Sequence, residues 1–185
     1  IAYDGEPILD KILQRFLCER FLGVHVIVNH QAEIISAYLL DRYHGGQVSI
    51  VKEKSMLGTA GGLKLINTTN KKYLLISNCD ILTNFSWSKF LEHHIDKQND
   101  LTILGVAKTS KSPYGVLDVD DEGRLIKMLE KPMSYNLINS GIYIINAHIL
   151  DLIDDGEALG MDTLIERTLS KKGNVGVFPT DDVNW

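Results

Sequence analysis

The sequence has few cysteines, no long apolar run and no basic cluster, and each of these absences excludes a class of protein. Only two cysteines occur, Cys18 and Cys79, and neither belongs to a CxxC or a His/Cys metal spacing, so we expect reduced thiols and a cytoplasmic setting. No apolar run approaches the roughly 20 residues of a membrane span, and no signal peptide is visible. The net charge is −5 and basic residues do not cluster, so neither a nucleic acid nor a membrane is an expected partner.

The composition is sufficient for one ordinary folded core. Hydrophobic residues make up 44% of the sequence and charged residues 23%, values typical of a single α/β domain. No internal repeat, low-complexity tract or linker is visible, so we predict one domain over residues 1–185. The sequence begins at Ile1 rather than Met and stops at Trp185 directly after a polar stretch, so we expect this domain to be truncated at both ends.

Helical and extended patterns alternate along most of the sequence. They predict helices over 8–17, 31–43, 87–94, 147–153 and 161–171, and strands at 24–28, 48–51, 73–76, 101–106, 142–145 and 175–178. Such alternation predicts an α/β fold, a Rossmann-like three-layer sandwich with a mostly parallel mixed sheet. Two extended runs around an acidic turn that ends at Gly123 predict a small antiparallel excursion near 114–130.

The strand predicted at 73–76 runs directly into Ser77, Asn78, Cys79 and Asp80. In open α/β sheets, ligands bind just beyond the carboxyl ends of such strands. A carboxylate there can hold Mg2+, which prefers oxygen ligands and bridges to substrate phosphates. Asp80 is therefore a candidate metal ligand, although Asp also commonly follows a strand simply to start a turn.

A second candidate is the glycine-rich segment 57–62, with the sequence LGTAGG, which leads into a predicted helical turn. Glycines let a phosphate or a flat ligand approach the backbone and its free N–H groups. Taken alone this signal is weak, because glycines also serve plain tight turns.

Several short motifs follow one another in a fixed order. They are Gly5-Glu6-Pro7, LGTAG at 57–61, Asn78-Cys79-Asp80, Tyr114-Gly115, Glu130-Lys131-Pro132, Asn139-Ser140-Gly141 and Trp185. Each is weak by itself, but the ordered set resembles the sugar-1-phosphate nucleotidyltransferases, also called NDP-sugar pyrophosphorylases, over essentially the whole sequence. The LGTAG segment is similar to the base-side loop of the mannose-1-phosphate guanylyltransferase-like branch.

Some parts of the family pattern are missing or altered. The family's Gly-rich phosphate loop precedes the first helix, and its second metal-binding Asp follows the Trp that is here Trp185; neither is in this sequence. Glu6 stands where the family usually has Lys, a change that we cannot interpret, and Cys79 replaces a glycine but is small enough to fit. We therefore expect an enzyme in the full-length protein and little or no activity from this chain by itself.

The resemblance implies attack by a sugar-1-phosphate oxygen on the α-phosphate of a nucleoside triphosphate, with release of pyrophosphate. Mg2+ is the implied cofactor, and Asp80 would hold it between the two substrates. Lys131 would neutralise the sugar phosphate, a task that suits the point charge of a lysine. Asp80 and Lys131 are thus the implied catalytic residues, although Lys131 has a plain alternative as a surface lysine at a strand end.

The resemblance also implies two sets of binding residues. The nucleotide-binding residues are Glu53, Gly58, Thr59, Ala60 and Gly61. The sugar-binding residues are Tyr114, Gly115, Glu130 and Asn139. Backbone groups of the glycine-rich turn would read the base edge, and Glu53 would accept from guanine N–H groups unless it is a surface carboxylate. The plain alternatives are core packing for Tyr114, a solvated carboxylate for Glu130 and turn formation for Asn139.

GTP and mannose 1-phosphate are the substrates expected from the LGTAG segment, and a homo-oligomer remains open. A non-catalytic nucleotide-sugar-binding regulatory subunit is an alternative that Glu6 and Cys79 mildly favour. A glycosyltransferase is a weaker one, because those enzymes usually carry a DxD pair and Asn78 occupies the place of its first Asp. No Ser/His/Asp or Cys/His spacing indicates covalent catalysis.

Overall fold

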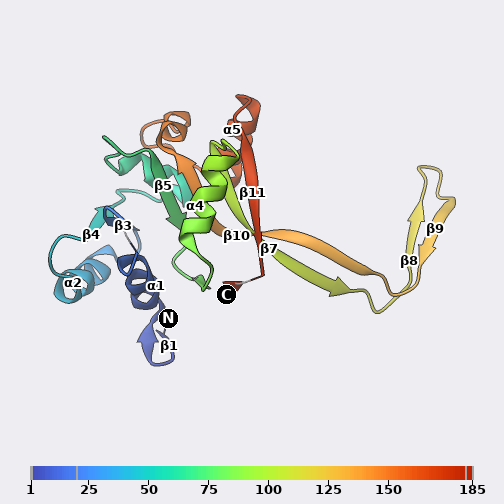
Figure 1. Cartoon of the computed structure of the whole chain (residues 1–185), viewed down its shortest axis with the longest axis horizontal. Coiled ribbons are helices and arrows are strands. Elements are labelled where there is room, and N and C mark those ends of the chain that lie inside the picture. Colours follow the sequence, from blue (N-terminus) through green and yellow to red (C-terminus); the bar gives the residue numbers. More distant parts are fainter. Residues whose placement is uncertain (1, 20, 182, 185) are drawn as a thin grey trace.

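Figure 1 shows a computed structural model of the chain, which describes residues 2–19, 21–181 and 183–184. Its helices and 3-10 turns are α1 (Ile8–Leu17), α2 (Ala32–Arg42), α3 (Gly58–Gly61), η1 (Gly62–Leu65), α4 (Trp87–Asp96), η2 (Ala147–Leu152) and α5 (Met161–Ser170). Its strands are β1 (Ala2–Tyr3), β2 (Glu6–Pro7), β3 (Val24–Val28), β4 (Val48–Lys52), β5 (Tyr73–Ser77), β6 (Leu82–Thr83), β7 (Leu101–Lys111), β8 (Val116–Val119), β9 (Leu125–Leu129), β10 (Met133–Asn146), β11 (Val175–Thr180) and β12 (Val183–Asn184). Each predicted element lies at its expected place, and β7 and β10 are longer than expected.

The strands form mixed sheets. The main sheet has the order β11-β7-β10-β5, in which β11 is parallel to β7 and β10 is antiparallel to both β7 and β5. The parallel pair β3–β4 forms a separate sheet. The α/β class is confirmed, but the expectation of a mostly parallel sheet is wrong for the main sheet. The reason is that β10 returns from a long excursion and enters between β5 and β7 against the direction of both.

Strand β10 divides the core into two apolar clusters. Tyr143 and Ile145 point to one face of the sheet, into a cluster with Leu164 of α5. Ile142 and Ile144 point to the other face, into a cluster with Phe90 of α4. Burial on both faces explains why this strand reads as a continuous apolar run. Among the described residues, no helix is both long and apolar enough to cross a membrane.

A buried carboxylate joins the first two long helices. Asp10 of α1 is fully buried, and it accepts hydrogen bonds from the hydroxyls of Tyr38 and Tyr43 and forms an ion pair with Arg42 at 2.9 Å. Burial, with the hydrogen bond to Asp10, raises the pKa of Tyr43 to about 12. This cluster fixes α1 against α2, and no sequence pattern pointed to it.

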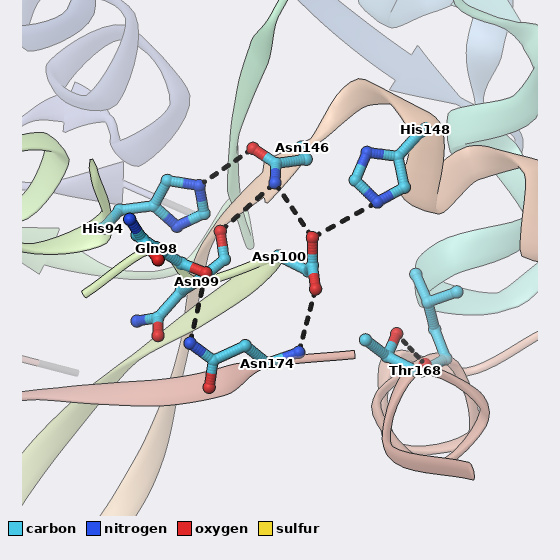
Figure 2. Close-up of polar contacts among 9 residues, drawn as sticks. His94, Gln98, Asn99, Asp100, Asn146, His148, Thr168 and Asn174 are labelled. Carbon is cyan, nitrogen blue, oxygen red and sulfur yellow. Dashed lines mark hydrogen bonds and ion pairs between the residues drawn. The ribbon is translucent and has the colours of Figure 1, made fainter. Parts of the chain in front are cut away.

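A polar network ties the sheet together at the amino end of β7 (Figure 2). The carboxylate of Asp100 accepts from the N–H of Asn174 (2.8 Å) and from the side chain of Asn146 (3.1 Å), and it pairs with His148 at 3.3 Å. The buried ring of His94 bonds to Thr102 at 2.7 Å and to Asn146 at 3.2 Å. The network therefore links α4, β7, β10 and β11 at the end of β7 opposite to the one from which the chain leaves the core.

Beyond this core, β7 and β10 continue as a paired ladder that ends near the pair Lys111–Met133. The hairpin β8–β9 extends that ladder away from the rest of the molecule (Figure 1). We call residues 107–139 the arm and the rest of the described chain the body. The antiparallel excursion expected near 114–130 is confirmed, and it is the outer part of this longer arm.

Candidate functional site

Asp80 lies just beyond the carboxyl end of β5. The N–H of Asn78 donates to the carbonyl of Gly141 at 3.0 Å, and Ile81, directly after Asp80, is 3% exposed in the cluster around Phe90. The turn is thus anchored on both sides of Asp80, whereas Asp80 itself is exposed. A carboxylate that is anchored in this way and open to solvent can take up a hard cation.

Gly141 brings the two motifs Asn78–Asp80 and Asn139–Gly141 into contact. Its φ is +80°, and a Cβ atom there would lie 2.5 Å from Nδ2 of Asn78, so only glycine allows this approach. The side chain of Asn139 accepts from the N–H of Gly141 (2.9 Å) and donates to the hydroxyl of Tyr143 (2.8 Å), where the β7–β10 register shifts. Asn139 therefore shapes a bulge, which agrees with its turn-forming alternative, and sugar contact by Asn139 stays a prediction.

Two cations of α1 lie close to the same edge. A small hollow of about 10 Å³ is lined by Lys11, Ile12, Arg15, Phe16, Ser77, Ile81, Leu82, Thr83 and Trp87. Arg15 donates to the carbonyl of Phe85 at 2.5 Å, and its guanidinium lies 5.7 Å from the ring centre of Trp87. Lys11 and Arg15 were missed from the sequence, although their spacing of four residues puts both on one face of the helix. They bring positive charge to the carboxyl end of β5, where Lys11 also forms an ion pair with Glu6 at 3.8 Å.

The glycine-rich turn is held by the backbone of residues 157–161. The carbonyl of Leu159 accepts from the N–H groups of Ala60 (2.9 Å) and Gly61 (3.2 Å), and the N–H of Leu159 donates to the carbonyl of Leu57 (2.9 Å). Ala60 and Gly61 are also buried. Their N–H groups are therefore occupied within the chain, and contact of these two residues with a base stays a prediction.

Gly58 and Thr59 form the exposed part of the turn. Gly58 has a φ of +75°, and a Cβ atom there would lie 2.6 Å from the carbonyl oxygen of Leu159. The hydroxyl of Thr59 accepts from the N–H of Met161 at the start of α5, at 2.9 Å. Sequence reasoning missed residues 157–161 because they act through backbone atoms, which leave no side-chain pattern. The flanking glycines at 156 and 160 were the only available signal.

An ion pair holds the segment that supports the turn. The guanidinium of Arg167 donates to both carboxylate oxygens of Glu157, at 2.8 and 2.5 Å, and to the carbonyl of Leu152 at 2.8 Å. The hydrogen bonds from Arg167 lower the pKa of Glu157 to about 2. Glu157 thus stays ionised at neutral pH and fixes the position from which Leu159 reaches the turn.

Glu53 lies beside the glycine-rich turn, at the carboxyl end of β4. Its N–H donates to the carbonyl of Val28 at 2.9 Å, and the side chain of Asn29 donates to its carbonyl at 3.3 Å. A Cβ atom on Gly62 would collide with Oε1 of Glu53, so the half-buried carboxylate rests against the turn. This placement agrees with a role beside Gly58 and Thr59, and recognition of a base stays a prediction.

The other expected residues gather at the base of the hairpin β8–β9. A Cβ atom on Gly115 would lie 3.1 Å from Oε2 of Glu130, and Nζ of Lys131 lies 3.9 Å from Oε1 of the same carboxylate. Lys131 has a φ of +46°. Tyr114 is 77% exposed, which excludes the core-packing alternative for it. Ser112 fixes the group because its hydroxyl donates to the carbonyl of Tyr114 at 2.9 Å.

The expected site residues thus fall into two places. Asp80, Glu53 and the glycine-rich turn belong to the body, whereas the group around Lys131 belongs to the arm, whose hairpin extends away from the body (Figure 1). The expectation that Lys131 meets Asp80 is not met in this arrangement, because β7 and β10 carry the hairpin outward. Within residues 2–19, 21–181 and 183–184, no three His, Cys, Asp or Glu side chains gather into a metal site. Trp185 lies outside the described residues.

The comparisons with known proteins define the class. The family model described as "Nucleotidyl transferase" matches residues 1–185, and the chain belongs to this family. Its relatives are sugar-phosphate nucleotidyltransferases. The mannose-1-phosphate guanyltransferase of Pichia angusta is 31% identical over 163 residues, which cover 83% of this chain and 45% of that protein. The catalytic subunit beta of the mannose-1-phosphate guanylyltransferase of Dictyostelium discoideum is 33% identical over 147 residues, covering 74% and 40%.

This chain spans about half the length of the curated relatives it matches. Among solved structures, HddC from Yersinia pseudotuberculosis complexed with GMP-PN has a TM-score of 0.74 at 22% identity, covering 100% of this chain and 81% of that one. A second structure of HddC gives a TM-score of 0.73 and covers 98% and 80%. These structures show that the chain has the fold of that group.

Proposed function

We propose that the protein that carries this chain transfers a nucleotidyl group from a nucleoside triphosphate to a sugar 1-phosphate, forming an NDP-sugar and pyrophosphate. The observation that carries this proposal is the contact of Asn78 with Gly141, which fixes an exposed Asp80 at the carboxyl end of β5. GTP and mannose 1-phosphate are the proposed substrates, in line with the names of the relatives and with GMP-PN in the similar structure. The proposed setting is cytoplasmic, and the complete domain would be a Rossmann-like three-layer sandwich.

Mg2+ is the proposed cofactor, and Asp80 its protein ligand. Mg2+ in such enzymes is commonly held by one or two carboxylates together with substrate phosphates and water, so a single exposed carboxylate fits this mode. When bound, Mg2+ would neutralise phosphate charge and help to align the two substrates. Lys11 and Arg15 would add fixed positive charge at the same edge.

For the proposed reaction, the chain has chiefly to hold two anionic substrates, the nucleoside triphosphate and the sugar 1-phosphate, in line. A sugar-phosphate oxygen forms a bond to the α-phosphorus as the bond to the bridging oxygen breaks, and pyrophosphate leaves with that bond's electrons. Asp80 would hold Mg2+, and Lys131 would hold the sugar phosphate. Tyr114, Gly115 and Glu130 would hold the sugar. Because this group lies on the arm, the proposal requires it to reach the Asp80 edge when both substrates are bound.

The base would lie against the exposed part of the glycine-rich turn. Gly58 and Thr59 face solvent there, and the Glu53 carboxylate rests beside Gly62. A carboxylate can accept two hydrogen bonds from the guanine edge, which adenine cannot offer. Ala60 and Gly61 would support the turn from below rather than contact the base through their N–H groups.

The test measures pyrophosphate release from GTP and mannose 1-phosphate by the full protein, with and without Mg2+. We expect Asp80→Asn to lower turnover at least about a hundredfold, as the loss of one well-placed electrostatic group does elsewhere. Asp155→Asn is the matched control, because it is also exposed but lies in the loop between η2 and α5 rather than in the turn after β5. Unchanged turnover in Asp80→Asn would reject the assignment of Asp80.

A non-catalytic nucleotide-sugar-binding regulatory subunit is the second candidate. The arm group favours it because this group lies on a hairpin that extends away from the body (Figure 1), and substrates cannot be joined if the arm group and the body stay apart. Calorimetric titration with GDP-mannose, GTP and Mg2+ separates the two candidates. Binding of the nucleotide sugar without any turnover would support the regulatory subunit.

A further inference from the structure

The hairpin β8–β9 exposes a continuous apolar face. Residues paired directly across two strands point to the same side, and here Leu117 pairs with Met128 and Val119 with Leu125. Ile126, two residues from Met128, shares that side. We call these five residues the apolar face. They are between 52% and 64% exposed, so nothing in the described part of the chain covers them.

One strand of the ladder that carries the hairpin, β10, also exposes apolar side chains. Met133, Tyr135 and Leu137 alternate along β10 and are each at least half exposed. Between them, Ser134 and Asn136 point to the other side, where Ser134 bonds to Ser110 across the ladder. Met133, Tyr135 and Leu137 therefore add exposed apolar surface next to the hairpin, on a side of the ladder that they share with Thr109 and Lys111 of β7.

A two-stranded ribbon of this kind is marginally stable by itself in water. Contiguous exposed apolar side chains on a folded protein usually mark a surface that another molecule covers. The arm would leave this surface in water if the molecule worked alone. The molecule that covers the arm has to match the length, the apolar face and the charge of the arm.

The charge of the arm is divided along its length. The inner part, residues 107–113 and 131–139, contains Lys108, Lys111 and Lys131 and no acidic residue. The outer part, residues 114–130, contains Asp118, Asp120, Asp121, Glu122 and Glu130 against Arg124 and Lys127. A second arm that runs in the opposite direction would place each acidic tip beside a basic base. The arm is therefore complementary to itself in both charge and hydrophobicity.

We propose that the arm is an interface for a second copy of this chain, in which two arms pack antiparallel, apolar face to apolar face, around a two-fold axis. A two-fold contact requires one surface that complements itself, and the arm meets this condition. The proposal goes beyond the nucleotidyl transfer proposed above and does not depend on it. It can be tested without substrates.

The experiment is sedimentation equilibrium of the chain over a range of concentrations, which gives a dimer dissociation constant. The test variant is Leu117→Ser with Met128→Ser, one directly paired rung of the apolar face. We expect it to raise the dissociation constant at least about tenfold, because each arm then lacks two apolar side chains that the wild-type dimer buries. The matched control is Val116→Ser with Leu129→Ser, the neighbouring rung on the opposite side, which should change the constant by less than about threefold.

The orientation has its own variant. Lys111→Glu should weaken the dimer, and a second change at the tip, Asp121→Lys, should restore part of the loss. If wild type and these charge variants all have the same dimer dissociation constant, the antiparallel arrangement is contradicted. A chain that is monomeric at every concentration would overturn the proposal. This holds whether hydrogen exchange then shows the amides of the arm to be protected or exposed to solvent. A dimer that both double-serine variants weaken equally would overturn it too.

Discussion

The body and the arm use the same two strands in opposite ways. Within the body, β10 is buried on both faces from Ile142 to Ile145, and its bulge locks the turn that carries Asp80. Within the arm, the same strand exposes Tyr135 and Leu137. The edge that carries Asp80 is therefore fixed by many independent contacts, whereas the contacts given above for the group around Lys131 lie within the arm. The proposed site combines a preformed half with a half that has to be brought to it.

Removing the hairpin should give the largest difference between the two regions. When residues 114–130 are replaced by an Asn-Gly turn, the neighbouring ends stay paired, because Ser112 donates to the carbonyl of Pro132. We expect pyrophosphate release by the full protein to fall to background while the melting temperature changes by only a few degrees. A loss of cooperative melting would show that the body depends on the hairpin and would break the comparison.

Two glycines with the same backbone conformation sharpen the comparison. Gly141 (φ +80°) in the body faces Asn78 at 2.5 Å from an added Cβ, whereas Gly123 (φ +79°) in the arm has nothing within 4 Å. Gly123→Ala carries only the left-handed strain, about 1–2 kcal/mol. Gly141→Ala adds a clash in a packed region and should cost about 3 kcal/mol or more in the free energy of unfolding. Denaturant melts of both variants measure this, and equal losses would contradict the account of a locked body.

Removing the charge of Lys131 on the arm should change the KM for only one of the two substrates. Lys131→Ala removes a charge-assisted hydrogen bond, and the KM for the sugar phosphate should rise about tenfold while the KM for GTP stays within about twofold. Lys127→Ala removes the same charge from the same hairpin and serves as control. Equal effects of the two variants, or a larger effect on GTP, would remove Lys131 from the sugar side.

The smallest effect concerns the network of Figure 2. Burial lowers the pKa of His94, so the folded state favours its neutral ring. The unfolded chain then binds more protons, and stability is complete above the unfolded pKa of about 6.5 and falls as the pH drops below it. Denaturant melts between pH 8 and pH 5 should show this decline, and His94→Gln should flatten it. His30→Gln, at an exposed position, should leave the slope unchanged.

Much of the fold was predictable because local patterns encode it. The cap at Ser86, which accepts from the N–H of Lys89 at 3.4 Å, and the helix after it follow from the sequence alone. The length of β10 could not be predicted from the sequence, because Ser134, Asn136 and Asn139 interrupt the apolar run that indicates a strand. The strands that pair with β10, and its direction relative to them, could not be predicted either, because both depend on contacts between residues far apart in the sequence.

The site shows the same division. The motifs that end in Asp80 and Gly141 were each visible in the sequence, but their contact depends on a backbone approach that no motif displays. Leu159 was missed because only its backbone contacts the glycine-rich turn. The group around Lys131 was correctly placed at one hairpin, whereas its distance from the body depends on the length of the ladder.

The most direct test of the account asks where a divalent cation binds. Mn2+ can replace Mg2+ at oxygen sites and broadens the NMR signals of nearby nuclei. With GTP present, we predict that Mn2+ broadens the amide signals of Asn78, Cys79 and Ile81 in wild-type protein, spares those of Leu117 and Met128, and loses this effect in Asp80→Asn. If Mn2+ does not broaden the signals of the turn after β5, or if the broadening persists in Asp80→Asn, the claim that Asp80 binds the divalent cation is contradicted.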